Sequence, residues 1–80
     1  MSRHATIETP VDHPETVARA LRPDNTPQMR TRVADDAVVT DIDRDTTGGL
    51  RATADDYVVN LTVATRAVQL AKNHQTSNNE

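Results

Sequence analysis

The sequence contains no cysteine, phenylalanine or tryptophan, and it has only two glycines. Without cysteine the chain cannot form disulfides or thiolate metal sites, and its redox compartment cannot be inferred. Tyr57 is the only aromatic residue, so the core must be built from aliphatic side chains, which bury less area than rings do. Eighty residues make one small domain whose own core gives marginal stability. The composition therefore favours stabilisation by a partner.

Lysine is nearly absent as well: the chain has eight arginines and one lysine, and nine of its twelve acidic residues are aspartate. This bias is typical of a GC-rich, salt-adapted organism such as a haloarchaeon, and codon usage alone could also produce it. The formal net charge of −3 excludes a polycation made for nucleic acid.

Long apolar runs are missing too. The N-terminal segment, MSRHATIETP, is polar, and no apolar run approaches the ~20 residues that a membrane-spanning helix needs. We therefore expect a soluble, cytoplasmic protein.

The first half of the chain predicts a strand followed by a short helix. The segment RHATIETPV alternates around Ala5, Ile7 and Thr9, and Pro10 should end the strand. In DHPETVARALRP, Asp12 and Glu15 have the spacing of a capping box, and Pro14 suits the first helical turn. The apolar face of this helix is expected to consist of Val17, Ala20 and Leu21.

Two further strands should form a hairpin. In MRTRV, Met29, Thr31 and Val33 share one side and two arginines the other, and AVVTDID alternates in the same way. The intervening ADD is expected to be the loop. The two arginines of the first strand would then face two aspartates of the second strand as cross-strand pairs.

A long helix should begin near Leu50, after a DTTGG loop, and run to about Ala71. The element order is then strand, helix, strand, strand, helix, which predicts an α+β domain with two helices on one face of a three-stranded antiparallel sheet. We assign residues 1–72 to this single domain and residues 73–80 to a polar, disordered tail.

The long helix carries two apolar stripes, although packing on a sheet requires only one. The first stripe should pack on the sheet. It consists of Leu50, Ala54, Tyr57, Val58, Leu61, Ala64, Thr65 and Val68. The second, Val59, Val63, Ala67 and Leu70, points elsewhere. It could widen the intramolecular face, but we favour a partner-binding surface because the first helix is too short to cover it.

Asp41, Asp43 and Asp45 alternate like the first ligands of a calcium loop, yet Thr46 and Ala52 stand where the EF-hand needs Gly and Glu. A weak divalent site remains the alternative to a solvated acidic face. The histidines His4, His13 and His74 lack metal-ligand spacing, so we expect no metal and no cofactor.

TGGL precedes the long helix without the lysine of a phosphate loop, so it indicates a tight turn, with anion binding as an alternative. No serine or cysteine stands in a nucleophile setting, and we expect no enzymatic activity of the chain itself. Four arginines, Arg30, Arg32, Arg44 and Arg51, could form a basic patch for RNA. Pairing with the aspartates is the favoured interpretation.

The segments RPDNT, MRTRV…AVVTDID and above all GGLRATADDYVVNLTVATRAVQL together resemble the Pcc family. These proteins are the small subunits of the archaeal and eukaryotic KEOPS complex and are related to the LAGE antigens. The resemblance covers roughly residues 4–71, in the same element order. Its most specific part is Leu50-Arg51-Ala52, followed by Tyr57; many relatives carry Asn where this chain has Asp55.

The resemblance implies a non-catalytic dimerisation subunit. KEOPS forms threonylcarbamoyladenosine beside the anticodon of tRNAs that read codons beginning with A. The chemistry belongs to a TsaD-family catalytic subunit, which uses a metal and threonylcarbamoyl-adenylate. The Pcc-type subunit docks on it through helices, forms a homodimer, and can assist tRNA binding.

We therefore expect a helical docking face, and a dimer contact at the sheet edge through HATIE or MRTRV. The residues expected to bind the partner are Val17, Leu21, Val59, Val63, Ala67 and Leu70. Possible tRNA contacts are Arg30, Arg32 and Arg51. The alternative is a small KH-like module that binds tRNA directly, although a G-x-x-G loop and stacking aromatics are absent.

Overall fold

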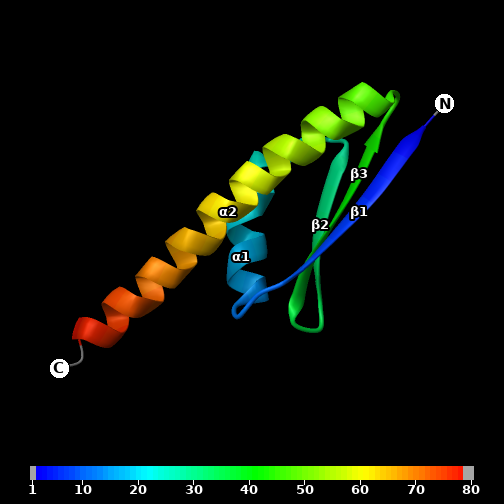
Figure 1. Cartoon of the computed structure of the whole chain (residues 1–80). Helices are drawn as coiled ribbons and strands as arrows, with labels where there is room; N and C mark the ends of the chain where they lie inside the picture. The colour runs from blue at the N-terminus through cyan, green and yellow to red at the C-terminus, as the bar shows by residue number, and fades with distance from the viewer. Residues whose placement is uncertain (1, 79–80) are drawn as a thin grey trace.

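A computed structural model describes residues 2–78 of the chain as one elongated α+β domain, with principal extents of 56 × 22 × 17 Å. The elements follow the predicted order. They are β1 (Arg3–Pro10), α1 (Pro14–Leu21), the short 3-10 helix η1 (Arg22–Asp24), β2 (Met29–Ala34), β3 (Ala37–Arg44) and α2 (Thr47–Asn78). The predicted α+β class, with two helices on one face of a three-stranded antiparallel sheet, is confirmed (Figure 1).

The sheet has the order β1-β3-β2, so β3 is central and pairs antiparallel with both neighbours. Period-2 alternation decides which side chains turn toward the helices. Val38, Thr40 and Ile42 of β3 are buried on the helix side, whereas Asp41 and Asp43 face away. On β1 and β2 the predicted alternation of half-buried and exposed residues is also confirmed.

The hairpin between β2 and β3 turns over Asp35 and Asp36. Asp35 has a φ of 57°, in the left-handed region that aspartate tolerates better than most residues. The carbonyl of Asp36 then accepts a hydrogen bond of 3.1 Å from the N–H of Val11. This bond ties the tip of the hairpin to the segment that joins β1 to α1.

Helix α1 differs from its expectation in two respects. Its N-cap is His13, which makes no side-chain cap, so the capping box expected from Asp12 and Glu15 does not form; Pro14 does open the helix. Its buried residues include Ala18 in place of Ala20, because the helix turns Val17, Ala18 and Leu21 inward.

Helix α2 is longer than predicted at both ends. It begins at Thr47, because the hydroxyl of Thr46 accepts a hydrogen bond of 2.9 Å from the N–H of Gly49 and so serves as the N-cap. The two glycines therefore lie in the first helical turn instead of in a loop. The helix continues to Asn78, beyond the expected end near Ala71, and the last two residues of the expected tail lie outside the described residues.

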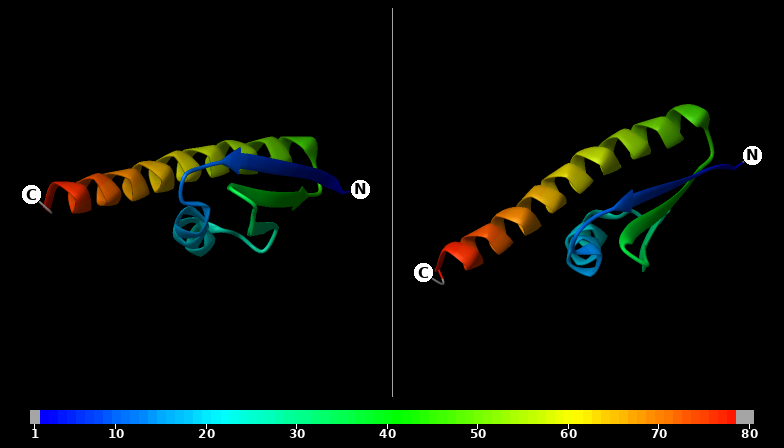
Figure 2. Two further views of the ribbon diagram at one scale, coloured as in Figure 1. Left: turned by 90° about the horizontal axis from the view of Figure 1, so that it is seen from below. Right: turned by 60° about the horizontal axis from the view of Figure 1, so that its bottom comes forward.

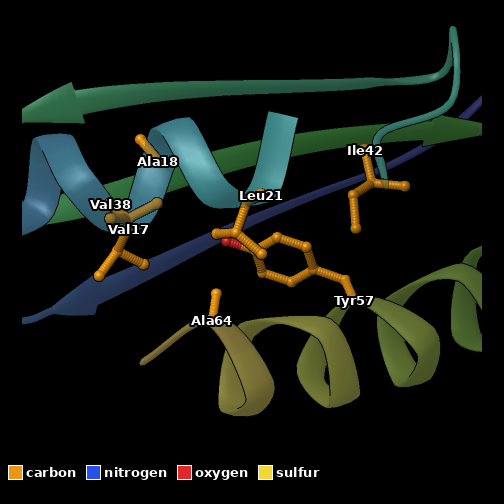
Figure 3. Close-up of a cluster of buried hydrophobic side chains, with 7 residues drawn as sticks. All are labelled: Val17, Ala18, Leu21, Val38, Ile42, Tyr57 and Ala64. Carbon is orange, nitrogen blue, oxygen red and sulfur yellow. The ribbon is translucent and has the colours of Figure 1, made fainter. Parts of the chain in front are cut away.

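The core lies between the helices and the inner face of the sheet (Figure 3). It is formed by Val17, Ala18, Leu21, Val38, Ile42, Tyr57 and Ala64. The ring of Tyr57 lies among side chains from α1 and β3 in this view. One large ring thus fills the space where both helices meet the sheet.

Candidate protein-interaction surfaces

Helix α2 presents an uncovered apolar surface, which we call the docking face and which consists of Val59, Val63, Ala67 and Leu70. Val59 is 62% exposed, Val63 63% and Leu70 68%, and Ala67 is exposed as well. Tyr57 and Ala64 of the same helix are buried, so the docking face and the core stripe lie on different sides of α2. Short α1 does not cover the docking face.

The first stripe behaves as predicted, apart from Val58, which is 49% exposed. Leu50, Ala54, Leu61 and Val68 pack partly buried against the core. The second stripe therefore does not widen the intramolecular face. It remains open to solvent on a helix whose C-terminal part, orange to red in Figure 1 and Figure 2, extends past the rest of the domain.

Val17 and Leu21 were expected to belong to the docking face, and this is wrong for the folded chain. Each is only 1% exposed and lies in the core. The sequence pattern places an apolar residue on a helix face but does not say whether that face meets the chain's own core or another chain. Here α1 is so short that its three buried residues are all needed to close the core over Tyr57.

The outer face of the sheet carries no helix, and a network of hydrogen bonds runs across it. The Thr6 hydroxyl donates to a carboxylate oxygen of Asp41 at 2.7 Å, and Arg32 pairs with the other oxygen of that carboxylate. His4 Nδ1 lies 2.8 Å from Asp43, and its Nε2 lies 3.1 Å from the Thr6 hydroxyl. The hydrogen bond from Thr6, followed by that from Arg32, lowers the pKa of Asp41 below its ordinary value.

This network bears on the expected metal and tRNA residues. Asp41 and Asp43 share the outer face, but Asp45 lies beyond the end of β3. Among the side chains that the structure describes, residues 2–72, no cluster of three or more His, Cys, Asp or Glu could hold a metal ion. Arg32 pairs with Asp41 as expected. Arg30 stands opposite Asp41 in the register, and the two residues line a shallow hollow together. Arg30 forms no ion pair with any residue that the structure describes.

The three arginines considered for tRNA are not on one element. Arg30 and Arg32 lie on β2, whereas Arg51 lies in the first turns of α2 and is exposed. Arg44, the fourth of the expected basic patch, turns toward α2 and donates to the hydroxyl of Thr53. Its guanidinium is thus used inside the domain.

The two sheet edges differ in availability. The N–H of Asp43 donates to the carbonyl of Gln28, toward β2, so by antiparallel geometry Ile42, Thr40 and Val38 bond to β1. The alternate residues of β1 point their N–H and C=O groups away from β3, so these groups have no partner in the sheet. These residues are His4, Thr6 and Glu8. These three residues make the β1 edge a row of unpaired backbone groups within the described part of the chain.

At the β2 edge, the Nε of Arg22 reaches the outward carbonyl of Thr31 at 3.5 Å. The Nδ2 of Asn25 also donates to the Thr31 side chain at 2.7 Å, so the segment after α1 lies against this edge. Of the two edges expected for dimer formation, HATIE is therefore more open than MRTRV.

None of the helices between residues 2 and 78 has the length and apolar character needed to cross a membrane. Comparisons with protein-family models, with curated proteins and with solved structures give no match.

Proposed function

We propose that this chain is a non-catalytic scaffold and dimerisation subunit of a KEOPS complex, acting in the cytoplasm. In that role it docks on the TsaD-family catalytic subunit through the helical docking face and brings two complexes together by self-association. The observation that carries the proposal is the exposure of Val59, Val63 and Leu70 on one face of a helix that extends beyond its own domain. Contiguous exposed apolar surface of this kind marks interaction sites.

The physical argument starts from what the chain gains by binding. Burying a Val or Leu side chain fully contributes roughly 1.5–3 kcal/mol, and the docking face offers three that are mostly exposed. A helix that packs one apolar face against partner helices makes its main contacts through residues spaced by three or four positions. Val59, Val63 and Ala67 follow each other at a spacing of four. A domain of this size, with one aromatic residue in its core, also gains stability from such a partner.

The β1 edge supports the self-association part of the proposal. His4, Thr6 and Glu8 would present their outward backbone groups to the same residues of a second copy, which gives an isologous antiparallel contact centred on Thr6. In that register His4 faces Glu8 of the second copy, a favourable pairing of opposite charges when the imidazole is protonated. Direct tRNA binding by the isolated chain is an outcome of the test below, since nothing in the geometry favours it.

The test is binding of the chain to its organism's TsaD-family subunit, measured by calorimetry. Val63→Asp and Leu70→Asp are each expected to weaken binding at least about tenfold, because a carboxylate would be desolvated in the contact. Val58→Asp makes the same kind of substitution at a 49% exposed position of α2 outside the docking face, so it is the matched control and should bind like wild type. If both docking-face variants fold and bind with unchanged affinity, the docking face is wrong.

A further inference from the structure

Helix α2 carries a second regularity on its solvent side, which we call the heptad row: Ala52, Asp56, Val59, Val63, Arg66 and Leu70. Successive members are separated by four and three residues in strict alternation, which is the a/d spacing of a coiled coil. All six residues are exposed. The row shares three members with the docking face and adds three further residues, which are Ala52, the acidic Asp56 and the basic Arg66.

The row is self-complementary when a second copy of the helix lies against it antiparallel. In an antiparallel pair of helices each a residue faces a d residue of the other helix, and each such facing pair forms one layer of the contact. A single register gives a favourable partner to every residue of the row, in three kinds of layer. Val59 faces Val63 of the second copy, Asp56 faces Arg66, and Ala52 faces Leu70. Each layer therefore joins valine to valine, acid to base, or the smallest apolar residue to the largest.

The two charged residues make this register specific. Asp56 and Arg66 form no ion pair or side-chain hydrogen bond with other described residues, so both charges are available. In a parallel pairing Asp56 would meet Asp56 and Arg66 would meet Arg66, which costs free energy through like-charge repulsion. The antiparallel register instead forms the Asp56–Arg66 pair twice.

The surrounding positions also permit the contact. The residues that flank the row and would meet across the two-fold axis are Asn60 and Thr62, which are uncharged. The row lies away from the buried Tyr57 and Ala64, so the bodies of the two copies would sit on opposite outer sides of the helix pair. The paired segment, from Ala52 to Leu70, spans ~27 Å at 1.5 Å per residue.

We propose that, in the free protein, the heptad row of α2 pairs antiparallel with the heptad row of a second copy, and that this pairing is mutually exclusive with docking on the catalytic subunit. The exclusivity rests on the proposed function, whereas the self-pairing does not. The docking face is then covered until the catalytic subunit displaces the second copy. Self-pairing uses a surface separate from the β1 edge, so both contacts can coexist.

The first arm of the test uses the absence of native cysteine. Chains with Val59→Cys are mixed with isotopically labelled chains that carry Val63→Cys, and the mixture is mildly oxidised. Because only one of the two chains carries the label, the three disulfide-linked species differ in mass and are separated by mass spectrometry. The antiparallel register predicts that the mixed species, position 59 to position 63, forms about tenfold faster than either like-with-like species. Like-with-like species in equal or greater amount, or no cross-links, would overturn the proposal.

The second arm tests the charge layer by complementation. In the cysteine backgrounds, Asp56→Arg alone and Arg66→Asp alone should each lower cross-linking about tenfold, because each places like charges opposite each other. Mixing the Asp56→Arg chain with the Arg66→Asp chain should restore it, since both layers are then acid to base again. Asp55→Arg, one residue away and outside the row, is the matched control. Failure of the mixture to recover, with both chains folded, contradicts the proposed register.

The third arm separates this inference from the proposed function. Adding the TsaD-family subunit should reduce the mixed cross-link in proportion to binding. Binding without any cross-link in the free chain would overturn the inference and leave the proposed function standing. A cross-link that forms but persists when the catalytic subunit is bound would support self-pairing and overturn the exclusivity.

Discussion

The hydroxyl of Thr40 on β3 donates a hydrogen bond of 2.7 Å to the phenolic oxygen of Tyr57 on α2, and both residues are buried. Thr40 also lies 2.9 Å from the Thr31 hydroxyl, which accepts from the side chain of Asn25 at 2.7 Å. This chain of polar contacts joins the connection after α1, the sheet and the long helix. It fixes the position of α2 on the sheet and so fixes which side of α2 faces solvent.

Replacing Tyr57 with Phe tests the contribution of the hydrogen bond between Thr40 and Tyr57. The ring and its packing remain, but the Thr40 hydroxyl loses its acceptor, so we expect the free energy of unfolding to fall by about 1 kcal/mol. Chemical denaturation measures the change. Tyr57→Ala should cost about 3–5 kcal/mol, since it also leaves a cavity at the centre of the core. Equal effects of the two substitutions would show that the hydrogen bond, and not the ring, carries the contribution.

The ionisation of Tyr57 predicts a loss of stability at alkaline pH. Burial raises the pKa of the phenol above its ordinary value, and the hydrogen bond from Thr40 offsets part of that rise. The folded-state pKa is thus above the unfolded value, so the stabilisation is fully present below about pH 10 and is lost as pH rises through the folded-state pKa.

Tyr57 is the only aromatic residue, so the phenolate absorbance reports this group alone. Denaturation measured from neutral pH to above the folded-state pKa should show the loss in wild type and its absence in Tyr57→Phe. The same alkaline loss in both proteins would mean that other groups cause it.

Asp41 predicts a corresponding effect in acid. Its pKa is lowered chiefly by the hydrogen bond from Thr6 and by Arg32. A lowered folded-state pKa means that the stabilisation is present above the unfolded value of about 3.9 and is lost as pH falls through the folded-state pKa. Asp41→Asn should therefore flatten the acid limb of the stability profile, followed by circular dichroism. An unchanged acid limb would show that the network on the outer face contributes nothing to folding.

The two adjacent glycines of α2 should respond differently to alanine. A Cβ at Gly48 would meet no atom within 4 Å, whereas at Gly49 it would lie 3.0 Å from the Thr46 hydroxyl oxygen and 3.2 Å from the Arg44 guanidinium. Gly48→Ala should therefore stabilise the protein by about 0.4–1 kcal/mol, because the unfolded chain loses freedom.

Gly49→Ala should increase the stability of the protein by less than Gly48→Ala does, or should lower it, because the added Cβ crowds the hydrogen bond between Thr46 and Gly49. Thermal melts of the pair measure the difference, with each variant serving as the other's control. Equal gains in both variants would contradict the described position of the Thr46 side chain.

Local pattern was sufficient to predict the strands, the hairpin and the element order. The alternation of Val38, Thr40 and Ile42 against Asp41 and Asp43 determines the face of β3, and a one-residue slip would bury the aspartates. The two apolar stripes of α2 likewise separated the buried side from the exposed one. In each case the relevant property repeats along one element.

Features that depend on contacts between elements could not be predicted in this way. Val17 and Leu21 fill the core because of how α1 crosses Tyr57, and no periodicity within α1 contains that information. Thr46 was not recognised as the N-cap because the following glycines suggested a loop. The charged members of the heptad row, Asp56 and Arg66, interrupt an apolar stripe, and only their spacing could have revealed them.

The most direct test of the account is light scattering on a sizing column in high-salt buffer, first with the chain alone and then mixed with its organism's TsaD-family subunit. The account predicts that the chain alone elutes with a mass above that of the 8.8 kDa monomer and that mixing gives a discrete assembly containing both proteins. Val63→Asp should reduce that assembly. A chain that stays monomeric and elutes separately from the catalytic subunit would contradict the proposed function.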